Sequence, residues 1–378
     1  MIPQTDPKAN YLAHREAIDQ AMRDVLLGGW YILGSKVNAF EEAFARYTGC
    51  NYAVGVASGT DAIELALRAI GVGPGHVVFT VSHTAVATVV GVERSGAMPV
   101  LVDIDPATYT MDPQSLRRAI EAVKASPPDG ATAKAIVVVH LYGHPADMGA
   151  ICEIARQHDL AVVEDCAQGH GASWEKRPVG SIGQVGAFSF YPTKNLGAIG
   201  DGGAITTNDA EIAERCRMLR EYGWRQRYVS EIRGVNSRLD ELQAAILLAK
   251  LQFLNADNAR RRLVAEYYDQ QITNPRIARP TGAAGCGHVY HQYVVRCEQR
   301  DDLRQYLRDR GVGTLIHYPQ PVHAQPAYRG RLAAVVPLPE TERAAGQVLS
   351  LPIYPELEPD SAVAVAGAVN GWHENSET

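Results

Sequence analysis

The stretch FSFYPTKNLGAIGDGG, residues 188–203, joins an apolar, strand-like run to one lysine that is followed by closely spaced glycines. The chain has 36 Lys and Arg residues but few lysines, and the others lie in segments typical of helix surfaces, polar loops or the N-terminal arm: Lys8, Lys36, Lys124, Lys134, Lys176 and Lys250. Lys194 alone stands between an apolar strand and small residues that let another molecule approach the backbone. Desolvation lowers the pKa of such a lysine, as formation of a Schiff base requires.

On both sides of this stretch, from Asn51 to Thr207, the chain alternates β-branched runs with helical patterns. This alternation predicts a mainly parallel sheet that is covered by helices. The expected strands are 51–56, 76–80, 99–102, 135–139, 161–164 and 185–190, and the helices between them include 86–95, 114–124 and 148–159. Three further helices are expected at 209–221, 238–254 and 255–273.

A Pro/Gly-rich stretch, NPRIARPTGAAGCG, begins at residue 274 and separates a smaller α/β segment from the rest. That segment is expected to contain a strand at 290–297, a helix at 300–310, a strand at 314–317 and a closing helix before the polar tail at 374–378. A chain of 378 residues is too long for one ordinary core. We therefore predict a large domain at 1–255, with a mostly parallel mixed sheet, and a smaller C-terminal α/β domain at 256–378.

Composition excludes several classes of protein. The net charge of −6 and the absence of a Lys/Arg-rich cluster argue against nucleic-acid binding. The apolar runs are too short to span a bilayer, and the N-terminus has no stretch that resembles a signal peptide. The six cysteines are scattered without a Cys-x-x-Cys pair, so we expect reduced thiols in a cytoplasmic protein.

Three separate features predict one cofactor. The turn Ser58-Gly59-Thr60 joins a strand to a helix, and a helix N-terminus with a nearby hydroxyl suits a phosphate group, although plain N-capping explains most such turns. Asp165 ends an expected strand, where a carboxylate faces the ligand crevice and stabilises a protonated pyridine nitrogen; its alternatives are a helix cap or a salt bridge. Together with the Schiff-base candidate Lys194, these features describe a pyridoxal phosphate site.

Motifs for competing cofactors are absent. No Gly-x-Gly-x-x-Gly follows a strand, no P-loop lysine precedes Ser or Thr, and no His-Glu-x-x-His occurs. The segment His288-Val289-Tyr290-His291 with Cys286 resembles a zinc motif, but it spans an expected strand whose alternation scatters the side chains. We therefore predict no metal site.

The motifs resemble those of the DegT/DnrJ/EryC1/StrS family of sugar aminotransferases, which are fold-type I pyridoxal phosphate enzymes. The resemblance covers nearly the whole chain and includes PVLVDID, VHLYGHPADM, EDCAQGHGA, FSFYPTKNLGAIGDGG, GVNSRLDELQAA and GVGTLIHYPQPVHAQPAY. It implies that Lys194 forms the Schiff base and then serves as acid and base, and that Asp165 pairs with the pyridine nitrogen. It also distinguishes this chain from the dehydratase branch, in which a histidine occupies the lysine position.

The resemblance implies roles for further cofactor-binding residues as well. Gln168 matches the partner of the ring hydroxyl, and the phosphate ligands match Ser58, Gly59, Thr60 and Ser189. Asn236 matches an asparagine that reaches the phosphate from the neighbouring subunit, which implies a homodimer with composite active sites. One position departs from the family, because Ala85 replaces an aromatic residue that commonly stacks on the cofactor. We expect His83 to replace it, the alternative being a histidine that faces solvent.

The implied reaction transfers an amino group from glutamate to a nucleotide-linked ketosugar, for polysaccharide or secondary-metabolite biosynthesis. The segment IHYPQPVH resembles the branch that aminates dTDP- or UDP-linked 3-ketosugars more than the 4-keto branch. Substrate contacts are expected from Arg220, Tyr222, Tyr228, His317, Tyr318 and His323, with packing or surface roles as the alternative. The rival functions are 4-ketosugar amination, dehydration of a nucleotide sugar, and a non-catalytic sensor that keeps the cofactor as a ligand.

Overall fold

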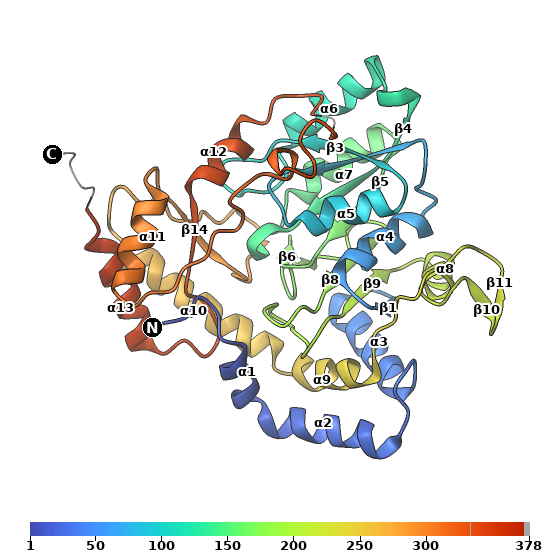
Figure 1. Cartoon of the computed structure of the whole chain (residues 1–378), viewed down its shortest axis with the longest axis horizontal. Helices are drawn as coiled ribbons and strands as arrows, with labels where there is room; N and C mark the ends of the chain where they lie inside the picture. The colour runs from blue at the N-terminus through green and yellow to red at the C-terminus, as the bar shows by residue number, and fades with distance from the viewer. Residues whose placement is uncertain (333, 374–378) are drawn as a thin grey trace.

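The computed structural model describes residues 1–332 and 334–373, and its centre is a seven-stranded sheet (Figure 1). In order across the sheet the strands are β1 (Tyr52–Val56), β9 (Gly203–Thr207), β8 (Val185–Ser189), β5 (Ala161–Asp165), β4 (Thr132–Val139), β2 (His76–Val81) and β3 (Met98–Val102). Strands β8, β5, β4, β2 and β3 are parallel, whereas β9 is antiparallel to both of its neighbours. The predicted α/β class with a mostly parallel mixed sheet is confirmed.

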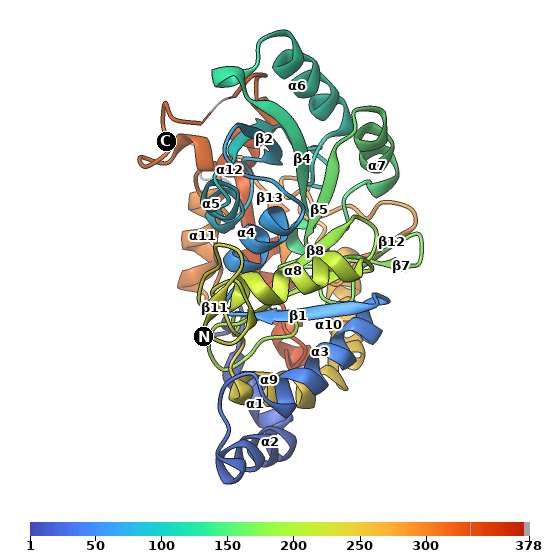
Figure 2. The ribbon, with the colours of Figure 1, turned by 90° about the vertical axis from the view of Figure 1, so that its right-hand side faces the viewer.

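Alternation along the strands sends side chains to two different cores. In β4, Ile136 and Val138 pack with α6 (Pro113–Ala125) and α7 (Met148–Gln157). Ala135 and Val137 pack in a core with α4 (Gly59–Ala69) and α8 (Ala210–Arg220), while α5 (Val86–Arg94) packs on α4 and β3. Helices therefore lie on both faces of the sheet (Figure 2), as a parallel sheet that is buried on both sides requires.

The N-terminal helices pack against the middle of the chain. Helix α1 (Pro7–Ala13) leads into α2 (Arg15–Gly28) and α3 (Ser35–Thr48), and the latter two both contact α9 (Glu241–Leu251). In Figure 1 these helices gather below the sheet, near the β1 and β8 strands. Phe40 and Phe44 of α3 pack edge-on against Phe190, which follows β8, so the segment that carries Lys194 rests on this helical layer.

A second, smaller core lies in the C-terminal part. Helices α10 (Leu254–Gln271), α11 (Arg300–Asp309) and α13 (Pro359–Asn370) share this core with the antiparallel pair of β13 (Tyr293–Arg296) and β14 (Val348–Leu351). Helix α12 (Pro339–Gln347) precedes β14 and contributes Ala344 to the core of the large sheet. The domain boundary at residue 255 falls in the first turn of α10 and stays a prediction.

The remaining elements are short. Strands β6 (Ser173–Trp174), β7 (Arg177–Pro178) and β12 (Cys286–Gly287) form a small sheet, and β10 (Trp224–Gln226) with β11 (Val229–Ser230) forms a hairpin that projects from the large sheet (Figure 1). The single-turn helices are η1 (Pro128–Gly130), η2 (Leu141–Gly143) and η3 (Val322–Ala324). Among the described residues, none of the helices has the length and apolarity that crossing a bilayer demands.

The predicted strand at 314–317 is wrong. Only Leu315 forms a bridge there, to Ser350, and the true partner of β13 is β14, which the sequence analysis did not predict. Two residues further on, the backbone carbonyl of His317 accepts a hydrogen bond from the Tyr142 hydroxyl rather than from a neighbouring strand. The predicted polar tail at 374–378 lies outside the described residues.

Candidate active site

Residues from distant parts of the sequence meet at the carboxyl ends of β5 and β8. The two strands are parallel neighbours, and Asp165 pairs in register with Ala187. Asp165 and Ser189 therefore emerge at the same edge of the sheet, and the loop after β8 brings Lys194 to it. This edge is the place where open α/β sheets bind their ligands.

The turn before α4 lies directly against the end of β8. A Cβ atom on Gly59 would stand only 2.5 Å from Ser189 Cβ, so the close approach requires glycine. The Ser58 hydroxyl caps the helix by accepting a hydrogen bond from the Asp61 N–H at 3.1 Å, as the capping alternative anticipated. Within residues 1–332 and 334–373 the Thr60 hydroxyl has no hydrogen bond, which leaves it available to an anion at this helix N-terminus.

Lys194 is half-buried at this edge. Desolvation lowers its pKa to about 8, and the charge of Asp165 opposes this by raising the pKa. In the described part of the chain its backbone N–H bonds to the Tyr191 carbonyl at 2.8 Å, but the side-chain amine makes no hydrogen bond. A lysine with an unpaired amine and a lowered pKa is suited to act as a nucleophile and as a base.

Three imidazoles surround this amine, and all of them are held neutral. Burial, together with the charge of Lys194, lowers the pKa of His170 to about 3 and that of His317 to about 4. The same two effects lower the pKa of His291 well below its usual value. Near neutral pH these rings therefore add no positive charge beside the amine, and Asp165 is the group whose negative charge raises the pKa of Lys194.

The Asp165 carboxylate is held by two donors. The Thr88 hydroxyl donates to one oxygen at 2.7 Å, and the Ala167 N–H donates to the other at 3.1 Å. Burial raises the pKa of Asp165, while these two hydrogen bonds and the Lys194 charge oppose that rise. Strand alternation turns Asp165 toward α5, on the opposite face from its neighbour Glu164.

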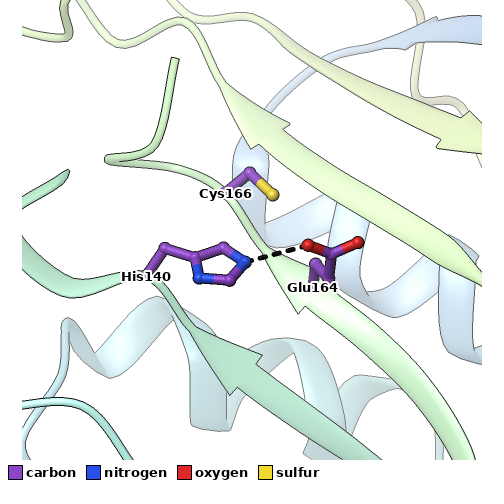
Figure 3. A group of neighbouring side chains, drawn as sticks. All are labelled: His140, Glu164 and Cys166. Atoms are coloured by element: carbon purple, nitrogen blue, oxygen red, sulfur yellow. Dashed lines mark hydrogen bonds and ion pairs between the residues drawn. The ribbon is translucent and has the colours of Figure 1, made fainter. Parts of the chain in front are cut away.

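Glu164 is buried and fully engaged. One of its oxygens accepts from His140 Nε2 at 3.0 Å and from the Gly180 N–H, and the other accepts from the N–H groups of Ile182 and Gly183. His140 Nδ1 accepts from the Ala146 N–H, so the ring proton sits on Nε2 and points at Glu164 (Figure 3).

Cys166 lies beside this pair in Figure 3, and the three side chains have ligand atoms within 4.8 Å of one another. Glu164 is nevertheless occupied by four donors, and His140 uses both of its ring nitrogens. No lone pair suited to a metal ion remains on them. We assign this cluster to fixing the end of β5, directly behind Asp165.

Gln168 connects the sheet edge with the C-terminal part of the chain. Its amide oxygen accepts from the Tyr142 N–H at 2.5 Å, and its amide nitrogen donates to the Tyr318 hydroxyl at 3.1 Å. Tyr142 has a positive φ of 60°, which for a residue other than glycine costs roughly 1 kcal/mol or more. The sequence analysis missed Tyr142, although its place in the motif VHLYGHPADM was the available signal.

The predicted stacking residue, His83, is buried completely. Its Nε2 contacts the Tyr142 hydroxyl at 2.9 Å, its ring packs against Tyr109 and Tyr142, and burial lowers its pKa to about 4. The alternative of a histidine that faces solvent is therefore wrong, because none of its surface is exposed. Stacking on a cofactor ring stays a prediction.

Other predicted substrate residues are placed in two different ways. His317 and Tyr318 lie at the sheet edge, through the contacts with Tyr142 and Gln168 described above. His323 instead packs through Nδ1 against the Ser82 hydroxyl at 2.7 Å, and its Nε2 lies 3.5 Å from Glu342. This arrangement favours the packing alternative for His323.

Arg220 is engaged within the fold, whereas the tyrosines at and beside the β10–β11 hairpin are exposed. Arg220 is buried, pairs with Glu41 at 2.5 Å and donates to the Gly55 carbonyl, so its guanidinium holds α3 and β1 together. Tyr222 and Tyr228 are 40% and 74% exposed and pack around Trp224. Asn236 is also exposed, so both tyrosines and the asparagine remain accessible to another molecule.

Comparison with known proteins agrees with this geometry. The sequence matches the DegT/DnrJ/EryC1/StrS aminotransferase family over residues 13–370. It is 47% identical to a dTDP-3-amino-3,4,6-trideoxy-alpha-D-glucose transaminase of Streptomyces venezuelae, over 99% of this chain and 96% of the relative. It is 48% identical to the erythromycin biosynthesis sensory transduction protein EryC1 of Saccharopolyspora erythraea, over 96% of both chains.

A solved structure gives the same result. The crystal structure of DesV from S. venezuelae superimposes with a TM-score of 0.93 at 47% identity, covering 98% of each chain. Sequence and structure match over almost the full length, and the fold-type I arrangement that the resemblance implied is confirmed. The chain belongs to the DegT/DnrJ/EryC1/StrS aminotransferase family.

Proposed function

We propose that this protein is a pyridoxal phosphate-dependent aminotransferase that moves an amino group from glutamate to a nucleotide-linked 3-ketosugar. The observation that carries the proposal is the pairing of Lys194, an unbonded amine with a pKa of about 8, with the buried carboxylate of Asp165. The named activity of the S. venezuelae relative, a dTDP-3-amino sugar transaminase, supports the choice of a dTDP- or UDP-linked 3-ketosugar.

The residues at the sheet edge fit the proposed cofactor. The turn at Gly59 and Thr60 offers free donors beside Ser189 for a phosphate, and the glycine is required there by the closeness of β8. Asp165 offers a carboxylate for a protonated ring nitrogen, and Gln168 offers an amide for the ring hydroxyl. Pyridoxal phosphate, when bound, supplies an aldehyde that condenses with amines and a ring that accepts an electron pair.

The chain's own groups then divide the remaining work. Lys194 Nζ removes and returns the proton at the carbon atom that exchanges its amino group, because its lowered pKa allows both steps near neutral pH. The rings of His170 and His291, whose pKa values burial and the Lys194 charge lower, do not compete for the proton of the amine near neutral pH. We propose His317 and Tyr318, which contact Tyr142 and Gln168, as contacts for the sugar.

We include a homodimer with composite sites in the proposal. Its support is a set of exposed apolar residues on α2, on the loop after it and beside Lys194: Leu27, Trp30, Tyr31, Tyr191 and Ile199. Asn236 is exposed as well, so its side chain is available to a second subunit. Its neighbour Ser237 fixes the backbone at this point, because the Ser237 hydroxyl donates to Asp61 Oδ2 at 2.9 Å. A cytoplasmic location is proposed as well, in keeping with six cysteines that are all free.

A sensory role without catalysis is the second candidate, since one relative carries the name of a sensory transduction protein. The presence of Lys194, Asp165 and Gln168 at one edge favours the enzyme, because a ligand sensor needs no acid-base lysine. Dehydration is disfavoured by the lysine, and the 4-keto alternative differs only in the position of the sugar carbonyl.

The proposal is tested by incubating the protein with pyridoxal phosphate, glutamate and a panel of 3-keto and 4-keto nucleotide sugars. We expect glutamate alone to convert the cofactor to its amino form, and a 3-ketosugar to convert it back with formation of an amino sugar. A dimer should be found by mass measurement in solution. Failure of the first half-reaction would contradict the assignment as an enzyme. Conversion of 4-ketosugars alone would contradict the choice of a 3-ketosugar and favour the 4-keto alternative.

A further inference from the structure

Two threonine hydroxyls form a chain that ends on Asp165. Thr84 Oγ1 lies 2.9 Å from Thr88 Oγ1, and Thr88 Oγ1 lies 2.7 Å from Asp165 Oδ2. All three residues are buried, with 2%, 1% and 4% of their surfaces exposed. Thr84 belongs to the Ser82-His83-Thr84 segment, whose neighbours Ser82 and His83 bond elsewhere, to His323 and Tyr142.

The direction of these hydrogen bonds follows from the chemistry of the groups. An ionised carboxylate can only accept, so Thr88 must give its single proton to Asp165. The lone pairs of the Thr88 oxygen are then free, and Thr84 donates its own proton to one of them. The chain therefore runs from Thr84 through Thr88 to Asp165, and each donor helps to orient the next.

The topology explains why the hydroxyl that donates to Asp165 comes from α5. Asp165 ends β5, whereas Ser82 and Thr84 follow β2, and β4 lies between these two strands. Thr88 lies in the first turn of α5, on the side of the sheet to which Asp165 points. Thr84 lies just before the N-cap of α5, Ala85, and its hydroxyl contacts Thr88 in the first turn of the helix.

We propose that Thr88, oriented by Thr84, is a positioning residue that keeps Asp165 ionised and aimed at the ring nitrogen of the cofactor. This inference rests on the proposed function. Burial favours the protonated carboxyl, and a protonated Asp165 would not hold a proton on the ring nitrogen. A hydroxyl that donates to the carboxylate opposes that effect, because hydrogen bonds to charged groups are among the stronger ones.

Other groups that face Asp165 also influence its protonation, and a pH experiment has to take them into account. Lys194 comes from the loop after β8, His140 from the end of β4, and Tyr318 from the C-terminal part. The Ala167 N–H holds the second carboxylate oxygen. None of these groups is altered by a substitution at Thr88, so the hydroxyl can be tested separately.

The test compares Thr88→Val, which keeps the shape but loses the hydroxyl, with Thr88→Ser, which keeps the hydroxyl. Each holoenzyme is loaded with cofactor that is isotope-labelled at the ring nitrogen, and the NMR shift of that nitrogen is followed against pH. We expect Thr88→Val to lower the pKa of the ring nitrogen by about one unit or more, a tenfold change, and to weaken cofactor binding about tenfold. Thr88→Ser should behave like the wild type.

Thr80→Val is the matched control, because Thr80 is buried and donates to the Val137 carbonyl at 3.1 Å without a contact to Asp165. It should leave the nitrogen titration unchanged. If Thr88→Val does not fold, Thr84→Val removes only the outer link and should shift the pKa in the same direction by less. A folded Thr88→Val holoenzyme that titrates like the wild type would overturn the inference, whereas a wild type that does not bind pyridoxal phosphate would overturn the proposed function instead.

Discussion

Two lysines, the half-buried Lys194 and the buried Lys250, and two buried carboxylates, Asp165 and Glu164, differ in the number of hydrogen bonds that they make. At the sheet edge, Lys194 has no side-chain hydrogen bond among the described residues, and Asp165 has two donors. Behind the edge, Lys250 donates to the Gly197 carbonyl at 2.6 Å, and Glu164 accepts from four donors. Burial lowers the pKa of both lysines to about 8.

The comparison shows that a shifted pKa does not identify a catalytic group by itself. Lys250 has the same lowered pKa as Lys194, but its amine is committed to the backbone of the loop that carries Lys194. Glu164 is as deeply buried as Asp165, but its oxygens have no free lone pair for a ligand. Lys194 keeps an amine that makes no hydrogen bond within the described residues, whereas the hydrogen-bonding groups of Lys250 and Glu164 are occupied. This difference separates the residues of the proposed site from the residues that support it.

The largest expected effect comes from Lys194→Ala, which removes the nucleophile and the acid-base group together. We expect the rate of amino transfer from glutamate to fall at least about 10³-fold, since general acid-base catalysis alone contributes about 10²- to 10⁴-fold. Borohydride reduction, which fixes the cofactor covalently to the lysine that holds it, should no longer label the peptide that contains residue 194. Lys176→Ala, at an exposed lysine, is the control; equal trapping in both variants would contradict the assignment.

Glu164→Gln should act on stability rather than on chemistry. The amide has one oxygen, so it leaves at least one of the four donors without a partner and presents N–H groups to the others. We expect the free energy of unfolding to fall by about 2–3 kcal/mol, the usual cost for a buried donor that loses a charged acceptor. Urea denaturation measures this loss, and an unchanged midpoint would show that the four donors are satisfied in another way.

Lys250→Met tests the supporting lysine through its pH dependence. Unfolded, Lys250 holds its proton up to about pH 10.5, but folded it loses the proton near pH 8, so the unfolded state binds more protons between these values. Wild-type stability should therefore rise relative to the variant through this window, by at most about 1.4 kcal/mol per pH unit.

The difference between the two unfolding free energies, measured from pH 7 to pH 10, checks this rise. Amino transfer should stay within about tenfold of the wild type, because Lys250 contacts only a backbone carbonyl. A difference that does not change with pH would mean that Lys250 keeps an ordinary pKa, and it would remove the likeness between the two lysines.

Asp165→Asn should give the smallest shift, in the titration of Lys194 itself. The charge of Asp165 raises the pKa of Lys194, so its removal should move that pKa below 8. The rate at which an amine-directed reagent modifies Lys194 in the cofactor-free protein, followed against pH, reports the midpoint. A midpoint that rises in the variant would contradict the electrostatic link between these residues.

Much of this arrangement was predictable from the sequence. The alternation of strands and helices predicted the sheet, since period and turn signals are local properties. The setting of Lys194 and the strand-end position of Asp165 predicted the cofactor chemistry. Lys250 was misjudged as a surface residue, because a helical pattern does not show which later segment covers the helix.

The points that the sequence left open or predicted wrongly all involve contacts between distant segments. Residues 314–317 have strand-like composition, but only Leu315 forms a bridge, and the His317 carbonyl accepts from the Tyr142 hydroxyl. For His83 the sequence left open a side chain that faces solvent, and Tyr109 and Tyr142 exclude that alternative by enclosing the ring. For Arg220 the sequence left open a surface role, but the side chain is buried and pairs with Glu41 of α3.

The sequence by itself predicted the fold class and the family, and it singled out Lys194 and Asp165 as the candidate central pair. These follow from local periodicity and from motifs that are continuous along the chain. Only the tertiary structure decided which charged groups have all their hydrogen bonds made and which do not, and that Thr88 contacts Asp165 and Tyr142 contacts Gln168. The physical reason is that hydrogen bonds between segments depend on distance and direction in space, which the order of residues does not state.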